Sequence, residues 1–220
     1  MSTTETARDL YVRAAGLLVD LDGTLVDSSA PVRRAWTAFA GRQGLDPADI
    51  LAVAHGRPSR ETVQQFASAA EHATEIWRLE EAECTDTAGT FALPAAEDVL
   101  CSGRRLAIVT SCSARLAGVR LGAAGLQVPE ILVSADDVAR GKPDPECFLI
   151  GARALGLDPH QCLVLEDSPA GITAARAAGM AVVAVRSTHD RAALAQASAV
   201  VSGLAELVGS WGPGRPGPRR

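Results

Sequence analysis

The sequence lacks long hydrophobic runs, an excess of basic residues and a recognisable secretion signal. Its longest apolar runs, such as Met180–Val185, are far shorter than the roughly 18 residues that cross a membrane. The net charge of -5 disfavours a general nucleic-acid binder, which is usually basic. The first residues show no basic start followed by an apolar stretch. We therefore expect a cytoplasmic protein that binds neither membranes nor nucleic acid.

Cysteine is sparse and its spacing is irregular. The chain has five cysteines, an odd number, and none of them forms a Cys-x-x-Cys pair; they are Cys84, Cys101, Cys112, Cys147 and Cys162. This pattern disfavours a disulfide framework and a zinc site. We expect reduced thiols that act as small core side chains.

The sequence contains no asparagine. It has 20 arginines but a single lysine, Lys142. A compact ammonium and a planar guanidinium are not interchangeable. The single lysine therefore indicates that position 142 requires an ammonium. The alternative is a surface lysine that chance has retained.

Short apolar runs recur along the chain, and a helical pattern follows each of them. They are Leu17–Asp20, Leu106–Thr110, Ile131–Ser134, Cys162–Glu166, Ala181–Val185 and Ala199–Val201. Continuous apolar runs bounded by turn residues are typical of strands buried on both faces of a parallel sheet. Their alternation with helices predicts an α/β, doubly wound fold.

One long stretch, from about Pro31 to Phe91, contains no convincing strand. Helical patterns run through Pro31–Arg42, Asp46–Ala54, Ser59–Ala70 and Ala73–Glu83. An all-helical stretch after the first strand predicts an inserted cap domain over residues 29–93. The core domain would then comprise residues 1–28 and 94–211. Residues 212–220, which are rich in glycine, proline and arginine, are predicted to be disordered.

The first predicted strand ends in two acidic residues, Asp20 and Asp22. Residues at i and i+2 point to the same side of an extended chain, and ligands bind beyond the carboxyl ends of such strands. Two close carboxylates favour a bound cation or a shared proton. Gly23 permits a sharp turn close to a ligand. A solvated acidic turn is the alternative, and a calcium EF-hand does not fit because this glycine is fourth rather than sixth.

Three further polar stretches follow the ends of later predicted strands or precede a helix. The Thr110 hydroxyl and nearby backbone N–H groups would form a phosphate cradle, although Thr and Ser also cap helices. The rigid loop 140–145 presents Lys142, whose ammonium would neutralise a phosphoryl group. Glu166 and Asp167 suit a hard cation such as Mg²⁺, or a stabilised helix N-terminus. In a parallel sheet these strand ends share one edge, so we expect the four stretches to converge.

These stretches resemble the four motifs of the haloacid dehalogenase superfamily. The residues that carry the resemblance are Asp20–Ser28, Thr110–Ser111, Gly141–Pro145 and Glu166–Gly171. The early helical insert resembles the subfamily with a helical cap after the first motif, and the resemblance extends from about Leu17 to Val201. It implies a Rossmann-like core and a magnesium-dependent phosphohydrolase.

The resemblance also implies roles for individual residues. Asp20 would be the nucleophile that forms an aspartyl-phosphate, and Asp22 would be the general acid and then the base. Phosphate would be bound by Gly23, Thr24, Thr110, Ser111 and Lys142. Magnesium would be ligated by Asp20, the backbone carbonyl of Asp22 and Asp167, with Glu166 direct or through a water. Dehalogenases of the family lack an acid at the position of Asp22, because a halide leaves without a proton.

The predicted cap contains His55-Gly56-Arg57-Pro58-Ser59-Arg60 between two helices. A His-Gly turn at this place resembles the family's phosphatases for small sugar and polyol phosphates. His55, Gly56, Arg57 and Arg60 are therefore expected to bind a small phosphorylated metabolite, since such a ligand needs hydrogen-bond donors. The alternative is that these arginines merely solvate a loop.

Three other functions stay open at this point. A β-phosphoglucomutase-like phosphomutase would share all four motifs, but it needs cationic cap groups for a second phosphate. A phosphoglycolate-type phosphatase is the second alternative. The third is a catalytically silent protein that binds a phosphorylated metabolite. The intact set of Asp20, Asp22, Lys142 and Asp167 disfavours the silent protein. We expect a monomer or a small homo-oligomer.

Overall fold

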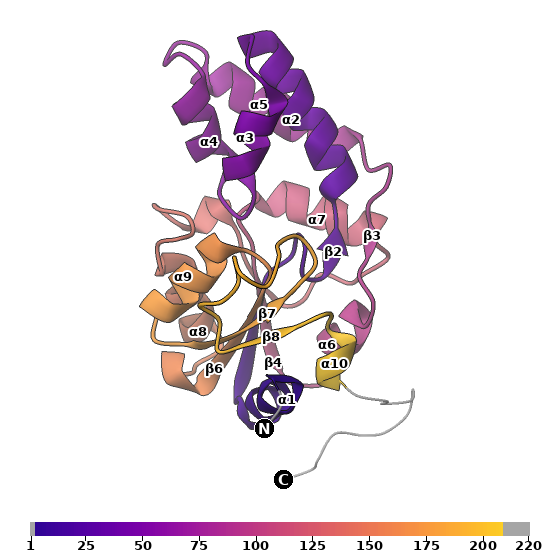
Figure 1. Ribbon diagram of the computed structural model, residues 1–220, viewed down its shortest axis with the longest axis vertical. Helices are drawn as coiled ribbons and strands as arrows, with labels where there is room; N and C mark the ends of the chain where they lie inside the picture. Colours follow the sequence, from indigo (N-terminus) through magenta and orange to yellow (C-terminus); the bar gives the residue numbers. More distant parts are fainter. Residues whose placement is uncertain (1–2, 209–220) are drawn as a thin grey trace.

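A six-stranded parallel sheet forms the centre of the molecule in the computed structural model, which describes residues 3–208 (Figure 1). The strand order is β5-β4-β1-β6-β7-β8. The strands are β1 (Gly16–Val19), β4 (Arg105–Val109), β5 (Ile131–Val133), β6 (Cys162–Glu166), β7 (Ala181–Val185) and β8 (Ala199–Val201). Each lies within one residue of its predicted bounds. The predicted α/β, Rossmann-like fold is confirmed.

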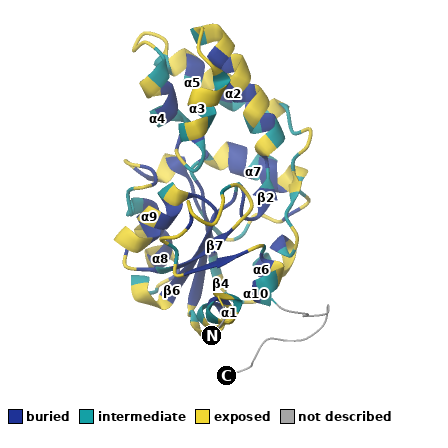
Figure 2. Ribbon diagram, viewed as in Figure 1, coloured by how far each residue is buried: buried dark blue, intermediate teal, exposed yellow. Residues whose placement is uncertain are grey.

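Apolar side chains cover both faces of the sheet, which is why the strands read as continuous hydrophobic runs. Leu17 and Val19 pack on one face with α1 (Thr3–Arg13), α6 (Ala96–Leu100), α7 (Ala114–Ala123) and α10 (Ala205–Val208). Leu18 packs on the opposite face with α8 (Glu146–Ala154) and α9 (Pro169–Ala177). The strands are accordingly buried in Figure 2. Two short 3-10 helices, Ala135–Asp137 and Pro159–Gln161, complete the connections.

Four helices form a separate layer at the top of Figure 1, which we call the helical cap. They are α2 (Ser29–Gln43), α3 (Pro47–Ala54), α4 (Ser59–Phe66) and α5 (His72–Thr85). Trp36, Phe39, Ile50 and Leu79 belong to their own buried cluster. The helix predicted to reach Ala70 stops at Phe66, because the chain turns and the Ser68 hydroxyl donates to the Glu71 carboxylate at 2.5 Å.

A short antiparallel ribbon joins the helical cap to the core. It pairs β2 (Val26–Asp27) with β3 (Phe91–Ala92) and was not predicted. We propose on this basis that residues 29–93 form the cap domain, and residues 1–28 and 94–211 the core. Residues 209–220, including the predicted disordered tail, lie outside the described part of the chain.

Two further features bear on the sequence predictions. Within residues 3–208, no helix is both long and apolar enough to cross a membrane. All five cysteines are free thiols.

Candidate active site

The site residues predicted in the core meet at the carboxyl edge of the central strands. Strand β1 lies between β4 and β6. Asp20, Thr110 and Glu166, at the carboxyl ends of these three strands, therefore lie side by side. The backbone N–H of Asp20 donates to Leu165 O at 2.9 Å and continues the ladder beyond β1. Asp20, Thr110 and Glu166 are all buried.

Lys142 reaches this edge from the loop before α8 and is itself buried. Its Nζ donates to Asp20 Oδ1 at 2.6 Å, to Glu166 Oε1 at 2.7 Å and to Val109 O at 3.1 Å. All three protons of an ammonium are therefore used. Burial disfavours the charge on Lys142, but Asp20 and Glu166 raise its pKa. The single lysine of the chain thus lies at the centre of the predicted site.

The carboxylates here outnumber the nearest cation. Oxygens of Asp20, Glu166 and Asp167 all lie within 4.8 Å of one another. Burial raises the pKa of Asp20 well above its ordinary value, and Lys142 offsets this only in part. Burial also raises the pKa of Asp167. A buried, all-oxygen, negatively charged donor set fits a hard divalent cation such as Mg²⁺.

Glu166 differs from the other two acids in its contacts. Its Oε2 accepts from the backbone N–H groups of Asp167 at 2.8 Å and Ser168 at 2.7 Å, and from Ser168 Oγ at 2.9 Å. Its Oε1 accepts from Lys142. Burial opposes ionisation, but Lys142 and Ser168 lower the pKa of Glu166. Both oxygens are thus engaged in holding Lys142 and the turn after β6.

Gly23 brings the first and fourth motifs together. Its φ of +84° is a conformation that L side chains rarely adopt, and an added Cβ would lie 2.0 Å from Asp167 Oδ2. The neighbouring Thr24 is buried, and its hydroxyl has no hydrogen-bond partner among residues 3–208. Both residues line a cavity at this edge.

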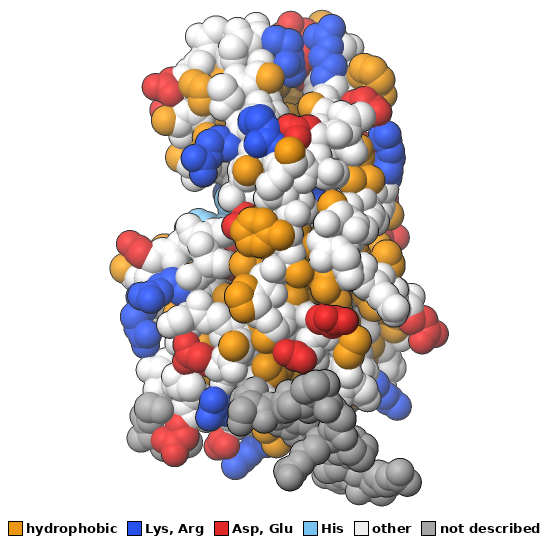
Figure 3. Space-filling model, turned by 90° about the vertical axis from the view of Figure 1, so that its right-hand side faces the viewer, with side chains coloured by type: hydrophobic (Ala, Val, Ile, Leu, Met, Phe, Trp, Pro, Cys, Tyr) orange, Lys and Arg blue, Asp and Glu red, His pale blue; other side chains and the backbone are white. Residues whose placement is uncertain are grey.

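The cavity has a volume of about 330 Å³ and lies between the sheet edge and the helical cap. Figure 3 shows an indentation between the upper and lower parts of the molecule, with histidine at its floor. Core residues that line it include Asp20, Asp22, Thr110 and Ser111. Cap residues that line it include Val32, Trp36, His55, Gly56 and Arg57. Its volume suits a small metabolite.

One predicted cap residue is placed elsewhere. Arg60 is not among the residues that line the cavity. Its guanidinium donates to Ala135 O at 2.8 Å and to Val138 O at 3.1 Å. The adjacent Glu61 accepts from the backbone N–H of Gly141 at 3.1 Å. Arg60 therefore links the cap to the core through these hydrogen bonds. The structure does not support the prediction that Arg60 binds substrate.

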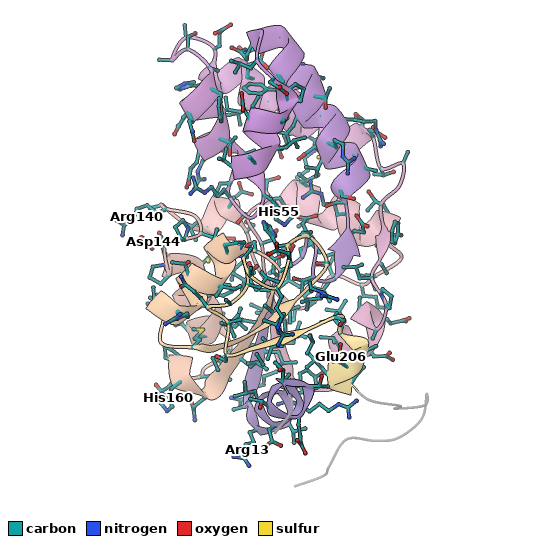
Figure 4. The ribbon with its side chains drawn as sticks, viewed as in Figure 1. Arg13, His55, Arg140, Asp144, His160 and Glu206 are labelled. Atoms are coloured by element: carbon teal, nitrogen blue, oxygen red, sulfur yellow. The ribbon has the colours of Figure 1, made fainter. Side chains whose placement is uncertain are left out.

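The His55-Gly56 turn sits directly on the core (Figure 4). His55 Nε2 donates to Asp167 Oδ2 at 2.8 Å, and the Ser111 hydroxyl donates to Gly56 O at 3.0 Å. Burial disfavours protonation of His55, but the hydrogen bond to Asp167 and its charge raise the pKa of His55 to about 9. The cap thus contributes a cation beside a carboxylate of the predicted metal site.

A family model for haloacid dehalogenase-like hydrolases matches residues 15–179, which include all four motifs and the helical cap. The chain belongs to the haloacid dehalogenase-like hydrolase family. The predicted resemblance is confirmed, and so is the expectation of an enzyme.

The curated relatives of this hydrolase include several phosphatases. It is 43% identical to hexitol phosphatase A of Escherichia coli (strain K12), over 90% of this chain and 94% of the relative. It is 36% identical to fructose-1-phosphate phosphatase of the same organism, over 80% and 99%. Among solved structures, a hydrolase from Pseudomonas syringae is 25% identical with a TM-score of 0.80, over 89% and 96%. A β-phosphoglucomutase from Clostridium difficile, 21% identical with a TM-score of 0.77, shares the fold over 88% and 93%.

The structure of this hydrolase adds residues that the sequence did not single out. Arg120 of α7 contacts both Asp22 and Glu83 of α5. The Thr188 hydroxyl donates to Asp167 from the loop after β7. Arg120 was detectable, because the helical spacing of Leu116 and Leu121 places it on the buried face of α7. The contacts of Glu83 and Thr188 join segments that are distant in the sequence, so no local sequence pattern predicts them.

A substitution at Gly56 tests whether activity depends on the contact between the cap and the core. Its φ is +77°, and an added Cβ would lie 2.5 Å from Ser168 Oγ. We expect Gly56→Ala to displace the His55 turn and to lower kcat/KM by about tenfold or more, because small displacements at an active site are costly. The measurement is steady-state kinetics on the preferred ester.

Gly44→Ala is the matched control for this substitution. Gly44 has a φ of +68°, but no other group among residues 3–208 lies within 4 Å of an added Cβ. Both variants should lose about 1–2 kcal/mol of stability from backbone strain. Only Gly56→Ala should lose activity, and equal kinetics in the two variants would show that the contact with Ser168 is unimportant.

Proposed function

We propose that this hydrolase is a magnesium-dependent phosphatase that cleaves small sugar or polyol phosphate monoesters through an aspartyl-phosphate on Asp20. One observation carries the proposal most directly. The Asp20 carboxylate lies at a metabolite-sized cavity, is held by Lys142, and has Asp22 two residues further on at the same cavity. The curated relatives named as hexitol and fructose-1-phosphate phosphatases support the substrate class.

The reaction would proceed in two steps. In the first, Asp20 Oδ attacks phosphorus, the ester P–O bond breaks, and Asp22 gives a proton to the departing alcohol. In the second, Asp22 takes a proton from water, which attacks the aspartyl-phosphate and releases inorganic phosphate and the Asp20 carboxylate. Splitting one displacement into two in this way needs a fixed nucleophile, and the bond from Lys142 to Asp20 supplies that.

The remaining site residues would hold the phosphoryl group and the cation. Thr110, Ser111, Thr24 and the backbone at Gly23 surround the position where phosphoryl oxygens would lie. Asp20, Asp167 and the backbone carbonyl of Asp22 would ligate magnesium. When bound, magnesium would neutralise charge on the transferring phosphoryl group. Glu166 would support this set through Lys142 and the turn after β6, because its oxygens already accept four hydrogen bonds.

The cavity favours hydrolysis over mutase chemistry. A phosphomutase must hold a second phosphate in the cap, which requires cationic groups there. Of the two cap arginines predicted to bind substrate, Arg57 lines the cavity and Arg60 is bound to core carbonyls. His55 is engaged by Asp167. The cap therefore offers less free positive charge than its sequence suggests.

Phosphate release from a panel of esters tests the proposal. The panel comprises hexose, 2-deoxyhexose, hexitol, glycerol and glycolate phosphates, each with magnesium and with excess chelator. We expect magnesium-dependent release, fastest for a sugar or polyol phosphate. Preference for glycolate phosphate would instead indicate a phosphoglycolate-type enzyme. β-Glucose 1-phosphate converted to glucose 6-phosphate would indicate a mutase, and no reaction with any ester would favour a silent binding protein.

A further inference from the structure

Two buried charged residues outside the four motifs, Arg120 and Glu83, form an ion pair, and Arg120 also contacts the Asp22 carboxylate. Arg120 Nη1 donates to Asp22 Oδ2, and Arg120 Nη2 lies 3.2 Å from Glu83 Oε2. The side chains of Arg120 and Glu83 are only 7% and 4% exposed, and all three residues line the cavity. Arginine and glutamate are rarely buried this fully unless they are paired.

Both oxygens of the Asp22 carboxylate have a protein donor. The Ser28 hydroxyl donates to Oδ1 at 2.6 Å, and Arg120 donates to Oδ2. Together they fix the plane and direction of the carboxylate. A guanidinium presents five donors in a rigid fork, so Arg120 can hold Asp22 and Glu83 at once, which an ammonium cannot do with the same geometry.

Glu83 connects this cluster to the helical cap. It belongs to α5, whose acidic residues meet α7 of the core at three successive places. Ser113 Oγ donates to Glu80 Oε1 at 2.6 Å, and Arg115 donates to Glu81 at 2.8 and 3.1 Å. The pair of Arg120 with Glu83 is the third contact and the most buried ion pair of the row.

We propose that Arg120 is a positioning residue that aims the acid–base carboxylate of Asp22, and that Glu83 of the cap anchors Arg120. The inference rests on the proposed phosphatase function. Proton transfer requires Asp22 within hydrogen-bond reach of the leaving oxygen. A carboxylate that has lost its donor to Oδ2 can rotate away from that position. The cost is greatest for an ester whose alcohol must receive a proton as it leaves.

A double-mutant cycle with two leaving groups tests this role. Arg120→Gln is made in the wild-type and Asp22→Asn backgrounds, and kcat and KM are measured on the preferred sugar or polyol phosphate and on p-nitrophenyl phosphate. For Arg120→Gln we expect kcat/KM, which reports only the step that releases the alcohol, to fall about 100-fold on the alkyl ester. The loss should be below about tenfold on p-nitrophenyl phosphate, whose leaving group needs no proton. KM should rise by no more than about threefold. In the Asp22→Asn background the same change should cost less than about threefold, because both substitutions remove one interaction.

Two further variants separate positioning from helix docking. Glu83→Gln should show the same leaving-group pattern with a smaller loss, about tenfold on the alkyl ester, since Arg120 keeps one partner. Arg115→Gln is the matched control, because it breaks an exposed ion pair between the same two helices. Its kcat should stay within about twofold of wild type. If Arg120→Gln does not fold, Arg120→Lys enters the same cycle.

Several outcomes would overturn the inference. Equal losses in kcat/KM on both esters, or a large rise in KM, would make Arg120 a ligand for substrate or a general structural support. Independent, multiplying losses in the Asp22→Asn background would also contradict it, as would a loss in Arg115→Gln equal to that in Arg120→Gln. A wild-type protein without magnesium-dependent phosphate release would overturn the proposed function as well, whereas an active wild type with any of these patterns overturns the positioning role alone.

Discussion

Asp20→Asn is expected to lower phosphate release by at least about 10⁴-fold, because the proposed mechanism forms its covalent intermediate on this carboxylate. The same substitution should leave the protein at least as stable as the wild type when magnesium is absent. Burial raises the pKa of Asp20, so its ionised form is less favourable in the folded than in the unfolded chain. An uncharged amide removes that cost, while Lys142 keeps Glu166 as a partner.

The sign of this stability effect can be checked against pH. A carboxyl group with a raised folded pKa weakens folding as the pH rises through that pKa, and the effect disappears when the group is protonated. Urea unfolding of both proteins in chelator should therefore show their free energies of unfolding converging as the pH is lowered. Asp9→Asn, at an exposed ion pair of α1, is the control and should change neither activity nor stability appreciably. Retained turnover in Asp20→Asn would rule out the aspartyl-phosphate.

Lys142→Met is expected to lower the free energy of unfolding by about 3–5 kcal/mol at neutral pH without magnesium. The substitution leaves Asp20 and Glu166 buried without the ammonium that contacts both of them. Phosphate release should also be lost, because Asp20, the proposed nucleophile, would no longer be held in place. Urea unfolding and the phosphate assay measure the two effects, and the stability loss should shrink at lower pH as the orphaned carboxylates take up protons.

Arg140→Met is the control for this second substitution. Arg140 lies two residues away in the same loop, and its ion pair with Asp144 is exposed on the arginine side. Its removal should cost no more than about 1 kcal/mol. Lys142→Arg keeps the positive charge but not the shape, and we expect it to regain part of the stability and little of the activity. A Lys142→Met protein as stable as Arg140→Met would show that the buried carboxylates of Asp20 and Glu166 do not depend on this lysine.

The strands of the sheet could be predicted from the sequence because they are buried on both faces. Each became a continuous apolar run, and the acidic and hydroxyl residues at their ends converge because parallel strands share a carboxyl edge. Helix α1 was missed for the opposite reason. It is polar along most of its length and buries only Ala7 and Tyr11, so it carries little periodic signal.

Contacts between distant segments account for most of what the sequence could not predict at the site. Arg57 and Arg60 look equivalent in the cap loop, yet Arg60 is used by carbonyls 75 and 78 residues away in sequence. Arg120 and Asp22 are 98 residues apart, and nothing in either segment specifies their pairing. Contacts of this kind depend on how the cap packs against the core. Local sequence patterns carry no information about that packing.

The two-residue ribbon that joins the cap to the core has an evolutionary consequence. Because the cap has its own apolar cluster and meets the core through few covalent and ladder connections, substitutions on its inner surface leave the sheet intact. Asp20, Lys142 and the acidic turn after β6 belong to the core. Natural selection can therefore vary cap residues that line the cavity but do not contact these core groups, such as Val32 and Trp36, while the core residues are inherited unchanged.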